Sequence, residues 1–399
     1  MQFFRNSVIL LKNKNLINLF SDNTTSKNKL FLFFENLIAD GTNGNDFLTG
    51  RDEERNTIHG YGGNDVILGA NDEDVLYGDD GDDNIWAGDS DDVVEGGDGN
   101  DVLFGGNNDD NLFGNNGDDT LLGGNGKDFL SGADGDDVAS GGNGDDFIRG
   151  GNGHDTLYGG DGNDTIEGGF DESGDTIYGE YGDDILAGNE NYSDFLYGGD
   201  DNDKLDGYGG NDVLNGGGGN DTLYGDYGDT TLLGGDGNDL IITASTPFMT
   251  GDSESGLTVV VAGAGNDTII NYHDKYSDQI DGGADDDTIK FIDSFDIPGL
   301  LAQYTFRYVN PTTFTTTYKI SGIIDTYSNI EYIETYSTRI SVSDLFKMIP
   351  VVAESDGSVL RQAIAGFDVD LVGITESSKL NNVNTYQSFL TASLDLKNL

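Results

Sequence analysis

The sequence predicts an all-β fold, a β-solenoid in which short strands wind into regular coils, followed by a β-rich C-terminal region. Three observations predict it. The chain repeats itself every nine residues, each repeat carries one large aliphatic residue, and the composition is that of tight turns. Gly accounts for 62 of the 399 residues, whereas Pro is found 4 times and Cys is absent.

The repeat reads G-G-x-G-x-D-x-U-x, where U is a large aliphatic residue, and 22 consecutive units run from Gly41 to Ile242. The sixth position is Asp in 20 of the 22 units, with Asn56 and Thr230 as exceptions. The eighth position is Leu, Ile or Val in 21 units, with Ala139 as the exception. Three units carry short insertions, around residues 53–55, 171–173 and 191–192. Degenerate copies follow at residues 262–270 and 282–290.

Each nine-residue unit is predicted to form half of one coil of the solenoid. The three residues x-U-x are extended, with U facing inward and its neighbours outward. The six residues G-G-x-G-x-D reverse the chain, because Gly tolerates the backbone angles of such a turn. Eighteen residues then make one coil, and odd and even units stack into two parallel sheets with a spacing of about 4.8 Å per coil. Eleven coils predict a rod about 50 Å long.

The high negative charge of the repeats predicts that they bind cations. The chain carries a net charge of −55, and residues 41–242 contribute −45 of it, from 50 acidic and 5 basic residues. We expect exposed turn carboxylates to stack about 5 Å apart and to repel one another. Carboxylate and carbonyl oxygens in a Gly-rich turn are typical ligands of Ca²⁺. The units offer at most about 20 inter-coil sites, and 20 divalent ions would supply +40.

The same composition excludes several classes of protein. Binding to nucleic acid or to an acidic membrane surface is disfavoured, because the phosphate charge would repel this chain. A disulfide scaffold is impossible without Cys, and no apolar run approaches the ~18 residues of a membrane-spanning helix.

The repeats resemble the RTX, or hemolysin-type, calcium-binding repeat. This resemblance implies a right-handed parallel β-roll in which repeat Asp carboxylates and turn carbonyls of two stacked turns hold Ca²⁺. Asn56 and Thr230 lack the carboxylate at the sixth position and are not among the implied ligands, and Asp46 is expected to be a terminal ligand. The implied ligands are Asp46, Asp65, Asp74, Asp83, Asp92, Asp101, Asp110, Asp119, Asp128, Asp137, Asp146, Asp155, Asp164, Asp175, Asp184, Asp194, Asp203, Asp212, Asp221 and Asp239.

The resemblance also implies a bacterial protein that is exported by the type I secretion machinery through an uncleaved C-terminal signal. Such a chain is disordered in the low-calcium cytosol and folds outside the cell. The expected function is that of a secreted, extracellular or cell-surface calcium-binding protein with a structural, adhesive or surface role. The alternative is the calcium-binding and export module of a secreted enzyme, such as an epimerase, a lyase or a hydrolase, or of a hemolysin-like toxin.

The sequence offers no catalytic constellation, and we expect no enzyme activity. It contains three histidines, His59, His154 and His273, and neither an H-E-x-x-H motif nor a G-x-S-x-G motif. His154 occupies a variable turn position, where we expect a solvated side chain.

The ninth position of the repeat points outward and differs between the two sheets. In odd units 3 to 17 it is large and apolar or aromatic in seven of eight cases, but in even units 4 to 18 in only two of eight. The simpler interpretation is the general preference of aromatic residues for strands. The alternative is a face that docks a terminal segment, a second roll or a glycan. Its main residues would be Trp86, Phe104, Tyr158, Tyr178 and Tyr197.

The sequence predicts four regions along the chain. Residues 1–40 are basic and apolar and are expected to form an N-terminal cap or helix. Residues 41–242 form the roll, and residues 243–300 mix degenerate repeats with spacers. Residues 301–399 are expected to be β-rich, with alternating strands near Tyr304, and to contain the type I secretion signal at the C-terminal end.

Overall fold

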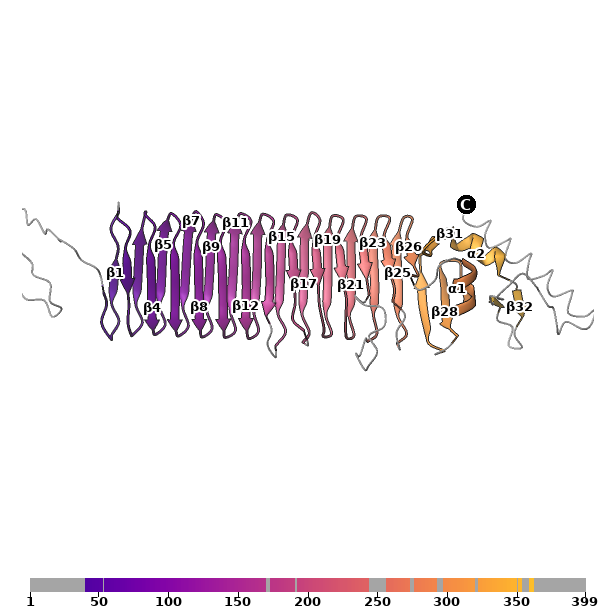
Figure 1. The fold of residues 1–399 in the computed structure, drawn as a ribbon, viewed down its shortest axis with the longest axis horizontal. Helices are drawn as coiled ribbons and strands as arrows, with labels where there is room; N and C mark the ends of the chain where they lie inside the picture. The colour runs from indigo at the N-terminus through magenta and orange to yellow at the C-terminus, as the bar shows by residue number, and fades with distance from the viewer. Residues whose placement is uncertain are drawn as a thin grey trace, which may run out of the picture.

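The structure, a computed structural model, describes residues 40–52, 54–169, 173–190, 192–243, 256–272, 276–292, 297–319, 322–349, 351–353 and 359–361. The described part is a straight rod of stacked coils that is closed at its C-terminal end by a small cap (Figure 1). The expected N-terminal cap or helix, apart from Asp40, and His273 lie outside the described residues, and so does the C-terminal region of the expected secretion signal, apart from residues 351–353 and 359–361.

One long sheet, here called the odd sheet, holds the odd-numbered strands of the roll. Neighbouring strands pair in parallel, with most registers offset by 18 residues, such as Val102 opposite Thr120. Its strands in the roll are β1 (Phe47–Thr49), β3 (Val66–Ala70), β5 (Asn84–Asp89), β7 (Val102–Asn107), β9 (Thr120–Asn125), β11 (Val138–Asn143), β13 (Thr156–Asp161), β15 (Thr176–Tyr181), β17 (Phe195–Asp200), β19 (Val213–Gly218), β21 (Thr231–Asp236), β23 (Val259–Ala264) and β25 (Gln279–Ala284).

The second sheet, here called the even sheet, runs along the other side of the rod and is also parallel within the roll. Its strands in the roll are β2 (Thr57–His59), β4 (Val75–Asp80), β6 (Val93–Asp98), β8 (Asn111–Asn116), β10 (Phe129–Asp134), β12 (Phe147–Asn152), β14 (Thr165–Gly169), β16 (Ile185–Ala187), β18 (Lys204–Asp206), β20 (Thr222–Tyr224), β22 (Leu240–Ile242), β24 (Thr268–Ile270) and β26 (Thr288–Lys290).

The core between the sheets is one side chain thick, as the repeat predicts. In β9, Leu121 is fully buried, whereas Thr120 and Leu122 on either side are partly exposed. Position eight of every repeat from Ile58 onward is at most 1% exposed, including Ala139. The core is therefore a single file of aliphatic residues, and most of the remaining interior consists of backbone and turn side chains.

The strands are longer than the sequence suggests. Many continue through the first three residues of the next repeat, as β9 does to Asn125. The turn is tight because Gly142 and Gly144 adopt φ angles of 112° and 128°, which residues with a Cβ rarely take. A Cβ on Gly144 would also overlap the carbonyl oxygen of Gly126 in the preceding coil.

The insertions leave the coil register intact. Thr156 in β13 pairs with Thr176 in β15, 20 residues later, and Thr176 pairs with Phe195 in β17, 19 residues later. The parity of odd and even units is therefore kept along the roll, as expected if the insertions loop out. The degenerate copies also stay in register, since β23 to β26 extend both sheets beyond Ile242.

The C-terminal cap changes the strand direction. Helix α1 (Ile297–Gln303) leads into β27 (Tyr304–Asn310) and β28 (Thr313–Tyr318), and β29 (Ile324–Ser328) then returns to pair in parallel with β25. The even sheet ends with β30 (Tyr332–Glu334) and the antiparallel β31 (Arg339–Ser341), followed by helix α2 (Val342–Met348). Strands β32 (Val351–Ala353) and β33 (Val359–Arg361) complete the odd sheet.

Aromatic side chains fill the interior of this cap. Phe291, Tyr304, Phe306, Phe314 and Tyr327 are all at most 3% exposed and contact one another at ring-centroid distances from 5.0 to 6.3 Å. Among the described residues, neither helix is long and apolar enough to cross a membrane.

Candidate metal centres

The sixth-position Asp residues form two rows, one along each turn edge of the rod. The odd edge comprises the turns that precede odd strands, and the even edge those that precede even strands. Along each edge the backbone N–H of one Asp donates to Oδ1 of the Asp one coil later, as Asp101 does to Asp119 on the odd edge and Asp110 to Asp128 on the even edge. Most of these bonds measure 2.7–2.9 Å. The two rows bring the sequence-predicted residues together edge by edge.

These carboxylates are buried, so the expectation that they are exposed is wrong, whereas the expected repulsion between row neighbours remains. Of the 20 Asp residues predicted as ligands, all except the partly exposed Asp46 are at most 3% exposed. The reason is the alternation of the strand, because position six lies two residues before the inward position eight and points to the same side. The carboxylates therefore lose their hydration as well as repelling one another.

The second oxygen of most of these carboxylates has no hydrogen-bond donor in the protein. A buried charged oxygen in this state costs several kcal/mol unless something compensates for the lost hydration. Eighteen side chains share this feature: Oδ2 is unpartnered in Asp65, Asp74, Asp83, Asp92, Asp101, Asp110, Asp119, Asp128, Asp137, Asp146, Asp164, Asp184, Asp203, Asp212, Asp221, Asp239, Asp267 and Asp287.

Most of these unpartnered oxygens face a space that a glycine at the first repeat position keeps open, whereas Ala87 and Ala262 hold that position in the repeats of Asp92 and Asp267. A Cβ built on Gly216, the first residue of its repeat, would collide with Oδ2 of Asp221 and would lie 2.6 Å from the carbonyl oxygen of Gly234 in the next coil. The same pair of oxygens surrounds Gly105, where Asp110 and the carbonyl of Gly123 approach. A carboxylate oxygen and a carbonyl oxygen thus converge on one small space, and this donor set suits a hard cation such as Ca²⁺.

No described group of three or more His, Asp or Glu side chains is arranged to hold a metal ion by itself. Each position in the rows supplies a single carboxylate. A cation at these positions would therefore complete its shell with backbone carbonyls of the stacked turns, which bear partial rather than full charges.

The pKa values of the row carboxylates reflect their burial. Desolvation is the main cause that raises the pKa of Asp101 to about 7 and that of Asp110 to about 8. The backbone N–H of the preceding Asp opposes this shift, and the neighbouring carboxylates of the row add to it. Bound cations would stabilise the ionised form and reverse the shift.

Four positions depart from the pattern. Oδ2 of Asp46 accepts hydrogen bonds from the backbone N–H and the hydroxyl of Thr42 at 2.6 and 2.8 Å, and Oδ2 of Asp194 accepts one from the N–H of Asn189 at 2.7 Å. Asn56 donates its amide to Asp74 at 2.8 Å, and Thr230 donates its hydroxyl to the carbonyl of Gly225 at 3.1 Å. Protein donors thus occupy the positions that a cation would take elsewhere.

In the structure the two rows include four further carboxylates, which the ligand set predicted from the sequence does not contain. Asp267 and Asp287 extend the even edge, whereas Asp278 and Asp325 extend the odd edge, and all four are at most 2% exposed. Asp267 and Asp287 lie in the degenerate repeats and were recognisable by their spacing from Ile269 and Ile289. For Asp278 and Asp325 the sequence offers only a weak signal, which is that each precedes a large apolar or aromatic residue, Ile280 or Tyr327, by two positions.

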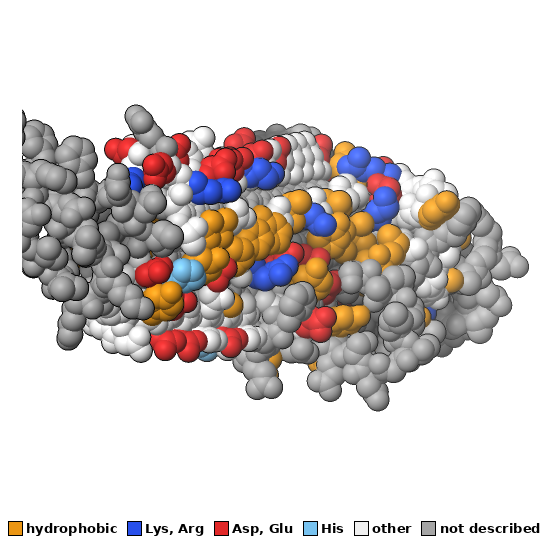
Figure 2. All heavy atoms as spheres, turned by 60° about the vertical axis from the view of Figure 1, so that its left-hand side comes forward, with side chains coloured by type: hydrophobic (Ala, Val, Ile, Leu, Met, Phe, Trp, Pro, Cys, Tyr) orange, Lys and Arg blue, Asp and Glu red, His pale blue; other side chains and the backbone are white. Residues whose placement is uncertain are grey.

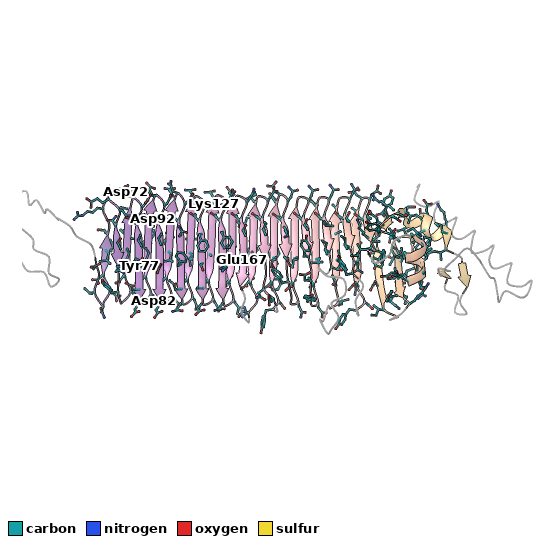
Figure 3. The ribbon with its side chains drawn as sticks, viewed as in Figure 1. Asp72, Tyr77, Asp82, Asp92, Lys127 and Glu167 are labelled. Carbon is teal, nitrogen blue, oxygen red and sulfur yellow. The ribbon has the colours of Figure 1, made fainter. Side chains whose placement is uncertain are left out.

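The outer surface of the turns is also acidic. Figure 3 shows Asp72 and Lys127 along one turn edge and Asp82 along the opposite one, while Tyr77 and Glu167 project from the face of the even sheet. Figure 2 shows one side of the rod, where hydrophobic side chains form a band with Lys and Arg side chains in and beside it, and acidic side chains gather above and below the band. His154 belongs to the exposed turn surface, as the sequence suggests, and its ring Nδ1 lies 2.9 Å from the carbonyl oxygen of Gly174.

The predicted aromatic face consists of two stacks of rings on the odd sheet. Tyr158, Tyr178 and Tyr197 stack in turn with centroid distances of 5.0 and 5.1 Å, and Trp86 stacks on Phe104 at 5.1 Å. Interplanar angles are at most 10°. The rings are thus cross-strand neighbours, in agreement with the simpler interpretation, and Leu122 and Ser140 lie between the two stacks.

A family model identifies the repeats of this chain. A family model described as RTX calcium-binding nonapeptide repeat (4 copies) matches residues 40–76, 68–103, 77–112, 104–139, 140–173, 171–192, 189–223, 224–244 and 274–290. No curated protein matches the sequence. One similar solved structure is a hyperactive, Ca²⁺-dependent, β-helical antifreeze protein from an Antarctic bacterium. It is 15% identical, with 74% of this chain and 94% of that chain covered and a TM-score of 0.26. Because the family model matches more than half of the chain, the protein belongs to the RTX calcium-binding nonapeptide repeat family.

Proposed function

We propose that the two rows of buried Asp residues hold Ca²⁺ ions and that the protein is a secreted structural component whose roll forms only when these ions bind. The observation that carries the proposal is the repeated Oδ2 atom that is buried and has no donor in the protein. The residues proposed as ligands are the predicted Asp residues with such an oxygen, together with Asp267 and Asp287.

The energetics of the metal-free roll support this proposal. A core one side chain thick supplies little apolar burial per residue, while ordering each backbone residue costs about 1–2 kcal/mol. The buried carboxylates add a desolvation cost at neutral pH. Ca²⁺ would contribute the missing stabilisation by replacing water around these oxygens, so that binding and folding become one equilibrium.

Ca²⁺ suits the rows better than Mg²⁺ does. The candidate ligands are single carboxylates and backbone carbonyls of flexible, Gly-rich turns, and Ca²⁺ accepts such irregular oxygen shells. Mg²⁺ prefers an octahedral shell with shorter bonds and gives up its water reluctantly. Extracellular Ca²⁺ modules bind in the range of about 0.1–1 mM, above the cytosolic concentration.

Export before folding is consistent with this calcium dependence. A chain that stays unfolded at cytosolic Ca²⁺ can pass through a type I exporter and then fold outside the cell. The test is coexpression of the full chain with a type I exporter, with a variant that lacks the last 50 residues as the control. Secretion of the full chain alone supports the proposal, whereas retention of both chains, or secretion of both, contradicts a C-terminal signal.

The calcium sites themselves are tested by counting bound ions. Equilibrium dialysis of the full chain against 5 mM Ca²⁺ should give more than ten ions per chain if most of the row positions are occupied. A value of one or two ions would contradict the assignment of the rows.

A further inference from the structure

The first and third residues of the odd strands from β3 to β23 form an outward face without charges, although the ends of some of these strands carry exposed charges such as Glu180 and Asp200. Each of its eleven strands presents its first and third residues outward, which makes 22 side chains, and none of these described residues is Asp, Glu, Lys or Arg. The corresponding 22 positions of the even sheet, from β4 to β24, carry five charges: Glu95, Arg149, Glu167, Lys204 and Asp206.

The composition of the chain makes this difference informative. Because 23% of all residues are charged, about five charges are expected among 22 positions, and the even face carries that number. The odd face instead combines Val, Leu, Thr and aromatic residues. Several of them are well exposed, including Trp86 at 39%, Val138 at 41% and Phe195 at 44%. An exposed, uncharged and largely apolar sheet face is typical of an interaction surface.

The stacked rings restrict what this face can bind. Tyr178 is covered on one side by Tyr158 and on the other by Tyr197, with almost parallel planes. A sugar that stacks on an aromatic ring needs a free ring face, and the neighbouring rings already occupy these faces. The surface therefore offers ring edges, hydroxyls and β-branched side chains, which suit another flat sheet better than a glycan.

We propose that this face of the odd sheet, called the neutral face below, packs against the same face of a second copy of the chain. The net charge of −55 opposes contact between two copies wherever acidic side chains face outward, as they do on both turn edges. The neutral face is the long surface on which two copies meet without repulsion between directly opposed charges. Two identical flat faces related by a two-fold axis are complementary to each other.

The size of the neutral face suits a dimer. Eleven strands at about 4.8 Å extend over about 50 Å, and a width of about 10–15 Å gives roughly 500–750 Å² per partner. The total of about 1,000–1,500 Å² lies in the range of specific protein interfaces. The rod is straight over this length (Figure 1). This inference rests on the calcium-folded roll, because only the folded roll has the face and only bound cations offset the remaining repulsion.

The test is sedimentation velocity of the full chain in 5 mM Ca²⁺, with two single variants on neighbouring strands. Tyr178→Arg places a charge at the centre of the neutral face in β15, and Ala187→Arg places the same charge on the opposite face in β16. We expect the wild type and Ala187→Arg to be dimers, and Tyr178→Arg to raise the dimer dissociation constant about tenfold or more. Circular dichroism in Ca²⁺ should show the same β signal for all three proteins.

Three results would overturn the proposal: a wild-type monomer in Ca²⁺, equal association of the two variants, or loss of the dimer in 0.5 M NaCl. The last result would indicate Ca²⁺ bridges between acidic turns, which salt weakens, rather than an uncharged interface. Failure of the calcium-dependent fold itself would appear separately, as a missing β signal. The dimer and the proposed calcium role are therefore tested by different readouts.

Discussion

The backbone N–H of Asp101 donates a hydrogen bond of 2.7 Å to Oδ1 of Asp119, the equivalent residue one coil later. Asp119 is 1% exposed, and its other carboxylate oxygen has no partner in the protein. One oxygen thus links two coils, while the other remains available to a cation. This division of roles recurs along both edges and connects the metal sites to the stacking of the coils.

The first prediction concerns the carboxylate charge. Asp119→Asn keeps the Oδ1 acceptor but removes the charge from the buried row, so bound Ca²⁺ should fall by about one ion per chain and the folding midpoint should move to higher Ca²⁺. The adjacent Asp118 is exposed and accepts the N–H of Asp136, which an Asn can also do. Asp118→Asn should therefore bind as many ions as the wild type in equilibrium dialysis. Equal effects of both variants would contradict the assignment of ligands to the sixth position.

The second prediction concerns the space beside the carboxylate. Gly216→Ala would place a methyl group against Oδ2 of Asp221, whereas Gly218→Ala in the same repeat would meet its nearest atom at 3.9 Å. We expect Gly216→Ala to weaken Ca²⁺ binding and to lower the melting temperature in Ca²⁺ by several degrees, because one site is blocked and one coil is strained. Gly218→Ala should behave like the wild type in thermal unfolding. Equal melting temperatures for the two variants would show that the space does not hold an ion.

The rows and the core show how far the sequence determines the structure. The nine-residue period and the aliphatic eighth position predict the coil, the two parallel sheets and the buried file that contains Leu121. The burial of Asp119 was missed because a turn Asp suggests exposure, although its spacing from Leu121 places it on the inward side. Asp325 was missed because the chain between β25 and β29 passes through α1 and a hairpin, so no nine-residue spacing leads to it.

The third prediction concerns pH. In the metal-free roll the pKa of Asp101 rises from 3.8 to about 7 and that of Asp110 to about 8. Because the carboxyl pKa is higher in the folded state than in the unfolded state, protonation of the group stabilises the fold. This contribution to the free energy of unfolding is fully present below pH ~4 and is lost as the pH rises through about 7–8. Chelator-treated protein should therefore show more β signal in circular dichroism at pH 5 than at pH 8. More β signal at pH 8 would contradict the burial of charged carboxylates.

The same linkage predicts how protons and Ca²⁺ compete. Ca²⁺ must displace protons from the row carboxylates, so binding at pH 6 should be weaker than at pH 8 and should release more protons per ion. Titration calorimetry in two buffers with different ionisation enthalpies measures this release. A proton release that is the same at both pH values would show that the carboxylates are ionised before the metal binds.

The fourth prediction concerns the interruption of the odd edge at Thr230. The Thr230 side chain is 1% exposed and its hydroxyl is bonded to the carbonyl of Gly225, so this repeat lacks the row carboxylate. Thr230→Asp restores it and should add about one bound ion at saturating Ca²⁺. Thr222→Asp introduces the same charge at an outward position of β20 and serves as the control. An unchanged ion count for Thr230→Asp would contradict the site geometry at this coil.

The most direct test of the account is a Ca²⁺ titration of chelator-stripped protein at pH 7.5, followed by far-UV circular dichroism and by the fluorescence of Trp86, with Mg²⁺ as the control. We predict a cooperative transition from coil to β structure at roughly 0.1–1 mM Ca²⁺ and none with Mg²⁺ at the same concentrations. A protein that is already folded without metal and does not respond to Ca²⁺ would contradict the claim that calcium in the Asp rows makes the roll stable.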